Sequence, residues 1–448
     1  MFRPALLIIC YCLIVPSQAQ TLFLSEQGHY KLAPYVHYLQ EQGKTLSIEQ
    51  LIKNKNTLPW KKNESEEINF GFSSDGYWLK IEINNRYAIV SEWVLEISYP
   101  PLDHVDAYLY DSEDKLDAIY YAGDQIKVKN KIVNHPHIIL PISLPPNQDY
   151  TLFIRVQTQG SVQVPLTLWQ WEDFNYHTLV YFLMQGIFYG MVLLMALYNF
   201  VVWLSEKKAI YLYYVSYILF YTLFQSSLNG IGFQFVWPDY PQLNNLIIPS
   251  TLALMLSALS YFISDFFTAE KSSPRLHLLL KFSSYLYAAL AIICIFVAYS
   301  ISMLMMSILT AFTILLIIFL TIYMLKKKHP SAYFFALAWV VFLTGAIFLV
   351  GNKFGFIPIT IFSEYGLQFG AGLEIMFLSL ALADQLASSQ KAQIQAQEAS
   401  LQLAHQVNME RDKTMAAELE NYRLEKENSQ NLESLVSERT AELNSAME

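Results

Sequence analysis

One acidic side chain stands in the most apolar surroundings of this chain. Glu374 lies between Leu373 and Leu382, where Ser379 is the other polar residue. Burying an ionisable side chain in a membrane costs free energy, so such a residue is first considered as a functional one. Glu374 could pair with hydroxyl groups or with Asn199 and favour one of two helix positions. It could equally be a protonated or hydrogen-bonded residue that only holds helices together, and both interpretations stay open here.

An amide near the end of a different apolar stretch is the second candidate. Asn199 follows Tyr198 in a segment that is otherwise apolar. Interhelical hydrogen bonds of such side chains contribute roughly 0.5 to 2 kcal/mol in membranes. We predict that Asn199 fastens two helices, and we group Glu374, Asn199 and Tyr198 as candidates for coupling within the membrane.

The histidines offer little chemistry. His135 and His137 would point the same way on a strand, as a metal site requires, but Pro136 interrupts the strand and no third ligand stands nearby. His405 lacks the acidic neighbour of a phospho-accepting histidine, and residues 387–448 contain no glycine-rich nucleotide loop. We therefore predict no metal, no cofactor and no enzymatic activity.

Aromatic side chains in the N-terminal third could stack on a sugar or another planar ligand. The candidates for such a binding surface are Trp78, Trp93, Tyr108 and Tyr110. Aromatic residues on strands also fill cores, which is the competing interpretation. Trp169 and Trp171 lie a few residues before the first long apolar stretch, so we interpret them as anchors at a membrane interface.

Seven mostly apolar stretches lie between Leu179 and Leu386. Each approaches the roughly 20 residues that a helix needs to cross a membrane. The sequence therefore predicts a multi-pass membrane protein with a helical bundle at residues 177–386. The stretches are Leu179–Leu204, Ala209–Gln225, Leu246–Phe266, Leu280–Tyr299, Met303–Leu325, Ala332–Val350 and Ser363–Leu386.

Basic residues in the connecting loops predict the orientation of these stretches. Only Lys353 falls in the opposite loops. Because basic residues resist translocation, the N-terminal region should be exported and the C-terminus cytoplasmic. Residues 1–19 agree, with a basic residue, a short apolar run and small residues typical of a signal peptide. The cytoplasmic set comprises Lys207, Lys208, Lys271, Arg275, Lys326, Lys327 and Lys328.

The exported region, residues 20–176, has the pattern of an all-β sandwich. Short alternating or apolar runs, such as Tyr77–Ile83 and Tyr150–Val156, are separated by turn residues such as Pro145 and Pro146. A helical piece is expected at Ser47–Lys53. The three cysteines, Cys10, Cys12 and Cys294, leave the mature exported domain without a disulfide. The net charge of −9 argues for solubility and against a nucleic-acid partner.

The tail, residues 387–448, contains neither glycine nor proline and is predicted to be one long helix. Residues spaced seven apart in this tail form a mostly apolar column, which supports a weakly paired coiled coil and a homodimer. A polar residue in that column could fix the register. A solvated single helix or a partly disordered tail is the alternative. The column comprises Ile394, Leu401, Asn408, Met415, Tyr422, Ser429, Val436 and Leu443.

Several motifs resemble those of the bacterial seven-transmembrane receptors with diverse intracellular signalling modules. In the apolar block these are Leu197-Tyr198-Asn199-Phe200, Tyr211–Tyr214, Asn229–Pro238, Gly370–Met376 and Ser379–Asp384. In the exported region, Gly76–Ile81 and Ser98–Val105 resemble the family's second type of extracellular sensor. The resemblance implies a jelly roll akin to carbohydrate-binding modules. Leu432–Leu443 looks like the linker to an effector of cyclase or kinase type, which these 448 residues do not contain.

Together these features predict a receptor in the bacterial inner membrane. The exported domain would sense a carbohydrate or another small molecule, the helices would carry the change, and the coiled coil would control an effector. Its partners would be membrane lipid, this ligand and a second copy of the chain. The alternatives are a small-molecule transporter or permease, and a receptor scaffold that recruits a separate effector.

Overall fold

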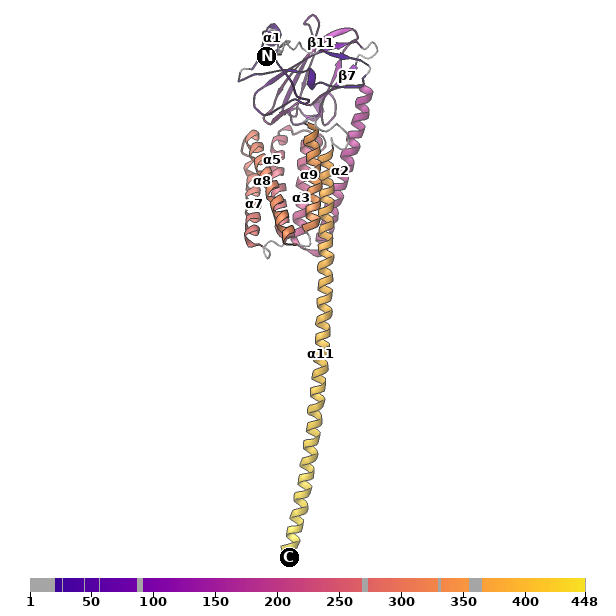
Figure 1. Ribbon diagram of the computed structural model, residues 1–448, viewed down its shortest axis with the longest axis vertical. Coiled ribbons are helices and arrows are strands. Elements are labelled where there is room, and N and C mark those ends of the chain that lie inside the picture. Colours follow the sequence, from indigo (N-terminus) through magenta and orange to yellow (C-terminus); the bar gives the residue numbers. More distant parts are fainter. Residues whose placement is uncertain are drawn as a thin grey trace, which may run out of the picture. The chain divides into compact units, whose positions relative to one another are not determined.

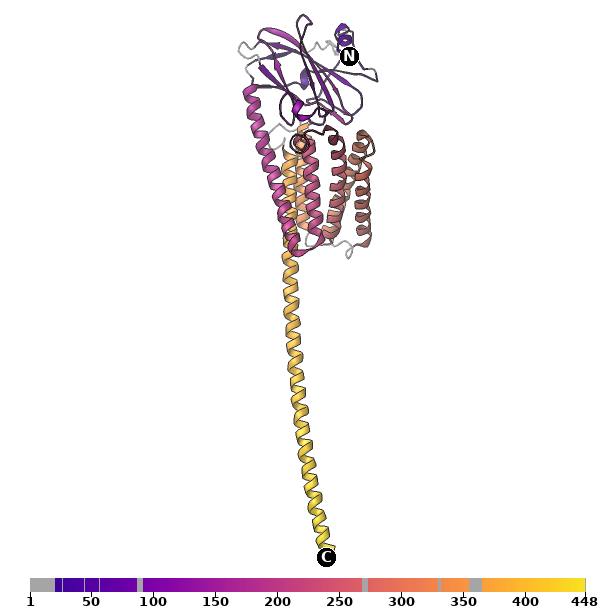
Figure 2. The ribbon, with the colours of Figure 1, turned by 180° about the vertical axis from the view of Figure 1, so that it is seen from behind.

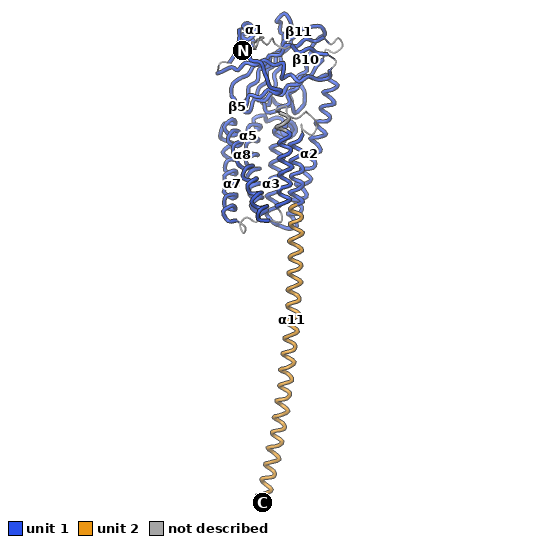
Figure 3. Tube along the Cα trace, viewed as in Figure 1, with its two compact units in different colours: residues 1–380 blue, residues 381–448 orange. Residues whose placement is uncertain are grey.

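The computed structural model describes residues 21–25, 27–43, 45–55, 57–86, 92–267, 273–328, 332–353 and 365–447. The expected signal peptide, residues 1–19, and Lys271 lie outside the described residues. The chain divides into two compact units, residues 1–380 and residues 381–448 (Figure 3).

The N-terminal part of the first unit is a β-sandwich (Figure 1). The larger sheet has the order β4-β3-β6-β11-β8-β9, with β1 pairing in parallel with β6. Its strands are β1 Leu22–Leu24, β3 His37–Gln40, β4 Lys61–Lys62, β6 Tyr77–Asn85, β8 His104–Asp111, β9 Leu116–Ala122 and β11 Gln148–Gln157. The second sheet has the order β10-β7-β13-β2, with β2 His29–Lys31, β7 Glu92–Ile97, β10 Ile138–Ser143 and β13 Leu166–Gln170. β5 Asn69–Phe72 and β12 Ser161–Gln163 form a separate pair.

Alternation along the strands builds the sandwich core. On β6, Leu79, Ile81 and Ile83 are fully buried, and they pack in one cluster with residues of β7 such as Leu95 and Ile97. Period-two patterning thus gives each sheet one apolar face, and the two faces meet. The predicted all-β sandwich is confirmed for this part of the chain.

The predicted helix near Ser47 is present as α1 Ile48–Lys53. The Ser47 hydroxyl accepts a hydrogen bond from the Gln50 amide, and the Gln50 side chain accepts one from the Ser47 amide. This reciprocal capping box explains why the helix begins at this point. The short 3-10 helices η1 Ala33–Tyr35 and η2 Val128–Asn130 lie in connections between strands.

The remainder of the first unit is helical (Figure 2). Five of the predicted apolar stretches, the first, second, third, fifth and sixth, match helices to within eight residues at each end. The fourth stretch was predicted to begin at Leu280, about six residues too late. The helix α7 begins at Pro274, because proline is tolerated in the first turn of a helix. The helices are α2 Trp171–Glu206, α3 Ala209–Leu228, α4 Ile231–Phe235, α5 Asn244–Phe266, α7 Pro274–Ile293, α8 Tyr299–Lys326, α9 Ala332–Lys353 and α11 Gly366–Met447, with the 3-10 helix η3 Pro241–Leu243 before α5.

Several of these helices are long and apolar enough to cross a membrane. Among the described residues five reach this standard: Trp171–Glu206, Pro241–Phe266, Pro274–Ile293, Tyr299–Lys326 and Gly366–Met447. Ala332–Phe348 is a shorter apolar helix. The tyrosine-rich α3 falls outside both groups, so a total of seven spans stays a prediction.

The described residues of the second unit, up to Met447, all belong to α11 and are helical as predicted. Its apolar heptad positions are open to solvent in the single chain, with exposed fractions of 64% for Leu401 and 60% for Leu443. A row of exposed apolar residues needs a partner helix for burial. Coiled-coil pairing therefore stays a prediction.

Candidate functional site

Loops of the sandwich contact the helical part through polar and backbone groups. The Val128 amide donates to the Pro238 carbonyl at 3.1 Å, and the Asn244 side chain donates to the Asp124 carbonyl at 3.2 Å. Trp237 holds Asn244 in place, since its indole nitrogen donates to Asn244 Oδ1 at 2.7 Å. We call this region, formed by residues 99–104, 123–137 and 158–160 with 229–245, the junction.

Gly230 permits the closest approach within the junction. Its backbone has φ of 72°, and a Cβ at this position would lie 2.7 Å from the Pro136 carbonyl oxygen. A side chain would be unfavourable for both reasons. Asn229, the residue before it, links the turn to α2: its carbonyl accepts from Tyr181 Oη at 3.2 Å, and its side chain donates to Gln185 at 3.2 Å.

Two buried carboxylates form the acidic part of the junction. Gln125 Nε2 bridges them, donating to Asp103 Oδ1 at 3.1 Å and to Asp124 Oδ1 at 2.8 Å. Asp103 also accepts from the Gln159 amide at 2.6 Å and from Asn245 Nδ2 at 3.3 Å. Burial and the neighbouring charge of Asp103 raise the pKa of Asp124 to about 7. Burial lowers the pKa of nearby Lys131 to about 8 against the attraction of Asp124.

A histidine cluster lies between the second sheet and α2. Glu96 accepts from the Trp169 indole at 2.8 Å and pairs with His137 Nδ1 at 2.6 Å. Burial raises the pKa of Glu96, but the bond and charge of His137 outweigh it, so the net pKa is lowered. Burial lowers the pKa of His135 to about 3, which keeps this ring neutral. Trp169 also stacks on His177, with 4.6 Å between ring centroids.

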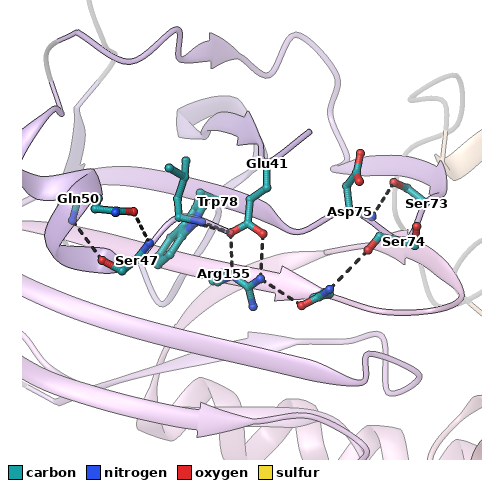
Figure 4. Close-up of polar contacts among 10 residues, drawn as sticks. Glu41, Ser47, Gln50, Ser73, Ser74, Asp75, Trp78 and Arg155 are labelled. Carbon is teal, nitrogen blue, oxygen red and sulfur yellow. Dashed lines mark hydrogen bonds and ion pairs between the residues drawn. The ribbon is translucent and has the colours of Figure 1, made fainter. Parts of the chain in front are cut away.

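Glu41 and Arg155 form a further polar group, on the face of the larger sheet that points away from the second sheet (Figure 4). Two guanidinium nitrogens of Arg155 donate to Glu41, at 2.9 and 2.8 Å, and Trp78 Nε1 donates to the same carboxylate at 3.0 Å. The hydrogen bond to Glu41 raises the pKa of Arg155. Arg155 also donates to Gln157, whose amide reaches the Ser74 carbonyl at 3.5 Å. The ion pair thus positions the loop that carries Ser74.

A chain of polar contacts continues between the helices. Gln185 on α2 and Gln368 on α11 exchange hydrogen bonds at 3.1 and 3.4 Å. Deeper along α11, Glu374 is 1% exposed and accepts from Tyr217 Oη at 3.0 and 3.3 Å. Such buried polar contacts can fix the relative position of neighbouring helices.

The next turn of α11 is held in the same way. Asn199 Nδ2 on α2 donates to Ser379 Oγ at 2.9 Å, and Tyr214 Oη on α3 donates to the Ile375 carbonyl. Of the two partners expected for Glu374, the structure shows a hydroxyl group, that of Tyr217, whereas Asn199 is hydrogen-bonded to Ser379. Tyr198 is 46% exposed on α2, and its grouping with Glu374 and Asn199 stays a prediction. We call the contacts of Gln185, Asn199, Tyr214, Tyr217, Gln368, Glu374 and Ser379 the helix network.

The proposed aromatic binding surface does not form. Trp78 and Trp93 are 1% exposed and Tyr110 is 7% exposed. Trp93 packs in the core between the two sheets, whereas Trp78 and Tyr110 pack with Leu51 of α1 on the other face of the larger sheet. Tyr108 is partly buried beside Trp78, with 5.9 Å between ring centroids. The two tryptophans before the first long apolar stretch lie in different surroundings. Trp169 lies near the end of β13 within the histidine cluster, and Trp171, 47% exposed, begins α2.

The other predicted residues lie at helix ends or on the tail. Lys207 and Lys208 lie between α2 and α3, and Arg275 lies in the first turn of α7. Lys326 is the last residue of α8, and Lys327 and Lys328 follow it. His135 and His137 both belong to the histidine cluster, but within the described ranges no three His, Cys, Asp or Glu side chains are grouped to hold a metal ion.

Sequence reasoning missed the junction carboxylates and their amide partners. Asp103 lies within the quoted Ser98–Val105 motif, but Asp124, Gln125 and Asn245 belong to no motif or periodic pattern. The one available signal was the pair Asn244-Asn245 directly before an apolar stretch. Only the fold brings these segments together.

A β-sandwich followed by apolar helices defines a membrane protein with an extracellular domain. A family profile described as 7TM diverse intracellular signalling matches residues 181–385. A second profile, described as 7TMR-DISM extracellular 2, matches residues 33–170. The chain belongs to this family of seven-transmembrane receptors with diverse intracellular signalling modules. A search of curated proteins found no match.

Proposed function

We propose that this chain is a signalling receptor of a bacterial inner membrane. Its exported domain, residues 20–176, would sense a small molecule, and residues 177–386 would carry the change to a cytoplasmic coiled coil at residues 387–448. The observation that carries the proposal is the pair of contact sets described above. The junction ties sandwich loops to the helices, and the helix network ties α2 and α3 to the helix that becomes the tail.

The distribution of basic residues supports the orientation. α2 leaves the sandwich at Trp171 and ends at Glu206, so the loop that follows lies at the far end from the exported domain. Lys207 and Lys208 occupy this loop, and consecutive helices return Arg275 and Lys326 to the same side. Basic residues favour the cytoplasmic side of a membrane.

Signal transfer requires two states of the helices that the ligand stabilises unequally. A ligand that changes the junction would act on α2 through Asn229 and on α5 through Asn244. The helix network offers α11 a set of specific partners, Tyr217 for Glu374 and Asn199 for Ser379. Exchange of these partners would move α11 and with it the tail.

The output would pass through paired tails. A second copy of the chain would bury the exposed column that includes Leu401 and Met415. The tail would then control an effector of cyclase or kinase type, joined to it or recruited from another protein. We assign no enzymatic activity to the 448 residues themselves.

A reporter fusion tests this function. With a diguanylate cyclase joined after Glu448, cyclic dinucleotide output reports the state of the tail. We expect Glu374→Gln to change basal output at least about fivefold, since coupling energies of about 1 to 3 kcal/mol are typical. Leu380→Ala, at a position of α11 that is 51% exposed, is the matched control and should leave output unchanged.

Unchanged output in Glu374→Gln would make Glu374 a packing residue and remove it from the coupling route. If Gly230→Ala at the junction also left output unchanged, the receptor proposal itself would be contradicted.

A further inference from the structure

A polar cavity of about 340 Å³ opens beside the junction, lined by residues of the junction together with Ser74 and Gln157. The sandwich supplies most of its lining and α5 supplies the rest, so one occupant would touch both parts of the first unit. Its volume falls in the range of sites for small ligands, roughly 300 to 1,000 Å³. The lining residues are Ser74, Asp103, His104, Gln125, Gln157, Thr158, Gln159 and Asn245.

Asp103 gives this cavity its charge. The side chain is 5% exposed, and its donors are the amide groups of Gln125, Gln159 and Asn245. Amide donors stabilise a carboxylate and fix its orientation but leave its negative charge without a countercharge. A ligand that carries an ammonium group would supply that charge.

The remaining groups suit hydroxyls better than rings or anions. Gln125, Gln157 and Asn245 bring side-chain amides, and Ser74 and Thr158 bring hydroxyl groups. His104 is the one ring and the one basic side chain among the described lining residues, which include no lysine, arginine, tryptophan, tyrosine or phenylalanine. The nearest guanidinium, that of Arg155, binds Gln157 but is paired with Glu41. The lining therefore disfavours an anionic ligand and stacking on a sugar face.

We propose that this cavity is the ligand site of the receptor and that it binds a small polyhydroxylated amine, of which an amino sugar is the chemical type. The ammonium group faces Asp103, and the hydroxyl groups bond to the amides of Gln125, Gln157 and Asn245. This proposal rests on the proposed function in one respect, namely that binding of the ligand would start the signal.

The position of Asn245 links binding to the helices. It lies in the first turn of α5, and its bond to Asp103 is long, at 3.3 Å. An ammonium group competes for the same carboxylate oxygen. Binding would thus exchange a contact between the sandwich and α5 for a contact with the ligand.

Three probes of one shape test the proposal on the full chain in nanodiscs. Glucosamine carries a positive charge, glucose is neutral and glucuronate is negative, while all three share the pyranose ring. Titration calorimetry should show glucosamine binding at least about tenfold more tightly than glucose, as expected for a charge-assisted hydrogen bond, with glucuronate weakest.

Two substitutions at one exposed position locate the binding. Ser74 lines the cavity, and its described hydrogen bond uses the backbone carbonyl, so a changed side chain leaves that bond in place. Ser74→Lys should weaken glucosamine binding about tenfold by repulsion, whereas Ser74→Glu, of similar bulk, should leave it equal or tighter. Asp103→Asn should abolish the preference for glucosamine over glucose.

Equal affinity for the three probes, tighter binding of glucuronate, or equal effects of Ser74→Lys and Ser74→Glu would each overturn the proposal. The proposed function is judged separately with the cyclase fusion. Charge-selective binding without a change in fusion output would keep the site and contradict the receptor. If Glu374→Gln changes the output of the fusion but the chain does not prefer glucosamine, the receptor proposal would stand and the proposed ligand site would be contradicted.

Discussion

Replacing Asp124 by asparagine should make the protein more stable at pH 8 but not at pH 4. Asp124 is 6% exposed, close to Asp103, and its pKa is raised from 3.8 to about 7. Because the pKa is higher in the folded state, folding favours the protonated carboxyl. This contribution is complete below about pH 4 and is lost as the pH rises to about 7.

The size of the effect follows from the two pKa values. A difference of about three corresponds to about 4 kcal/mol at pH values above 7. Asparagine has the shape of the protonated carboxyl, can accept the bond from Gln125 and carries no charge at any pH. The loss of attraction to Lys131 offsets part of the gain, so we expect about 2 to 4 kcal/mol at pH 8.

The assay is thermal unfolding of the full chain in nanodiscs, followed by intrinsic fluorescence at pH 4, 6 and 8. Asp124→Asn should unfold several degrees above the native chain at pH 8, and the difference should vanish by pH 4. Asp117→Asn, on the exposed side of β9, is the matched control and should show no such trend. A variant less stable than the native chain at pH 8, or a difference independent of pH, would refute the reasoning.

Three further pairs of substitutions test other parts of the structure through the same unfolding measurement. Gly230→Ala should cost at least about 1 kcal/mol because of its positive φ and the nearby Pro136 carbonyl, whereas Gly190→Ala, with open space around its Cβ position, should not. Glu41→Gln should cost about 1 to 3 kcal/mol by weakening the hydrogen bonds that the partly buried Arg155 guanidinium donates to Glu41. Breaking the half-exposed Lys55–Asp114 pair with Asp114→Asn should cost under about 1 kcal/mol, and equal costs would contradict this contrast. Glu374→Ala should cost about 1 to 3 kcal/mol by leaving the Tyr217 hydroxyl without its acceptor, and Glu374→Gln less; the opposite order would contradict the assigned bond.

Periodic features of this protein could be predicted from the sequence. The alternation in Tyr77–Ile83 marked β6, and long apolar runs marked the helices, because burial imposes these patterns directly. β9 was missed because it is an edge strand whose apolar residues, such as Ile119 and Tyr121, are exposed. The first two turns of α2 were not predicted, because Glu172 and Asp173 interrupt the apolar pattern.

The site was predictable only where one residue contrasts with its surroundings. Glu374 was recognised because a carboxyl group among apolar residues is unusual, but its partner Tyr217 depends on how α3 packs against α11. Asp103, Asp124 and Asn245 come from three distant segments, and no spacing in the sequence links them. Trp78 and Trp93 were correctly located on strands, but their burial depends on packing between distant segments, with the opposite sheet for Trp93 and with α1 for Trp78.

Disulfide cross-linking of the tail tests the central claim most directly. In membranes containing a chain with Cys294→Ala, a cysteine at Leu401 should cross-link parallel dimers, and Gly230→Ala at the junction should change the rate of cross-linking. Gly190→Ala should leave that rate unchanged. Monomeric tails in all three chains, or the same rate with and without Gly230→Ala, would contradict the claim that the junction controls the tail.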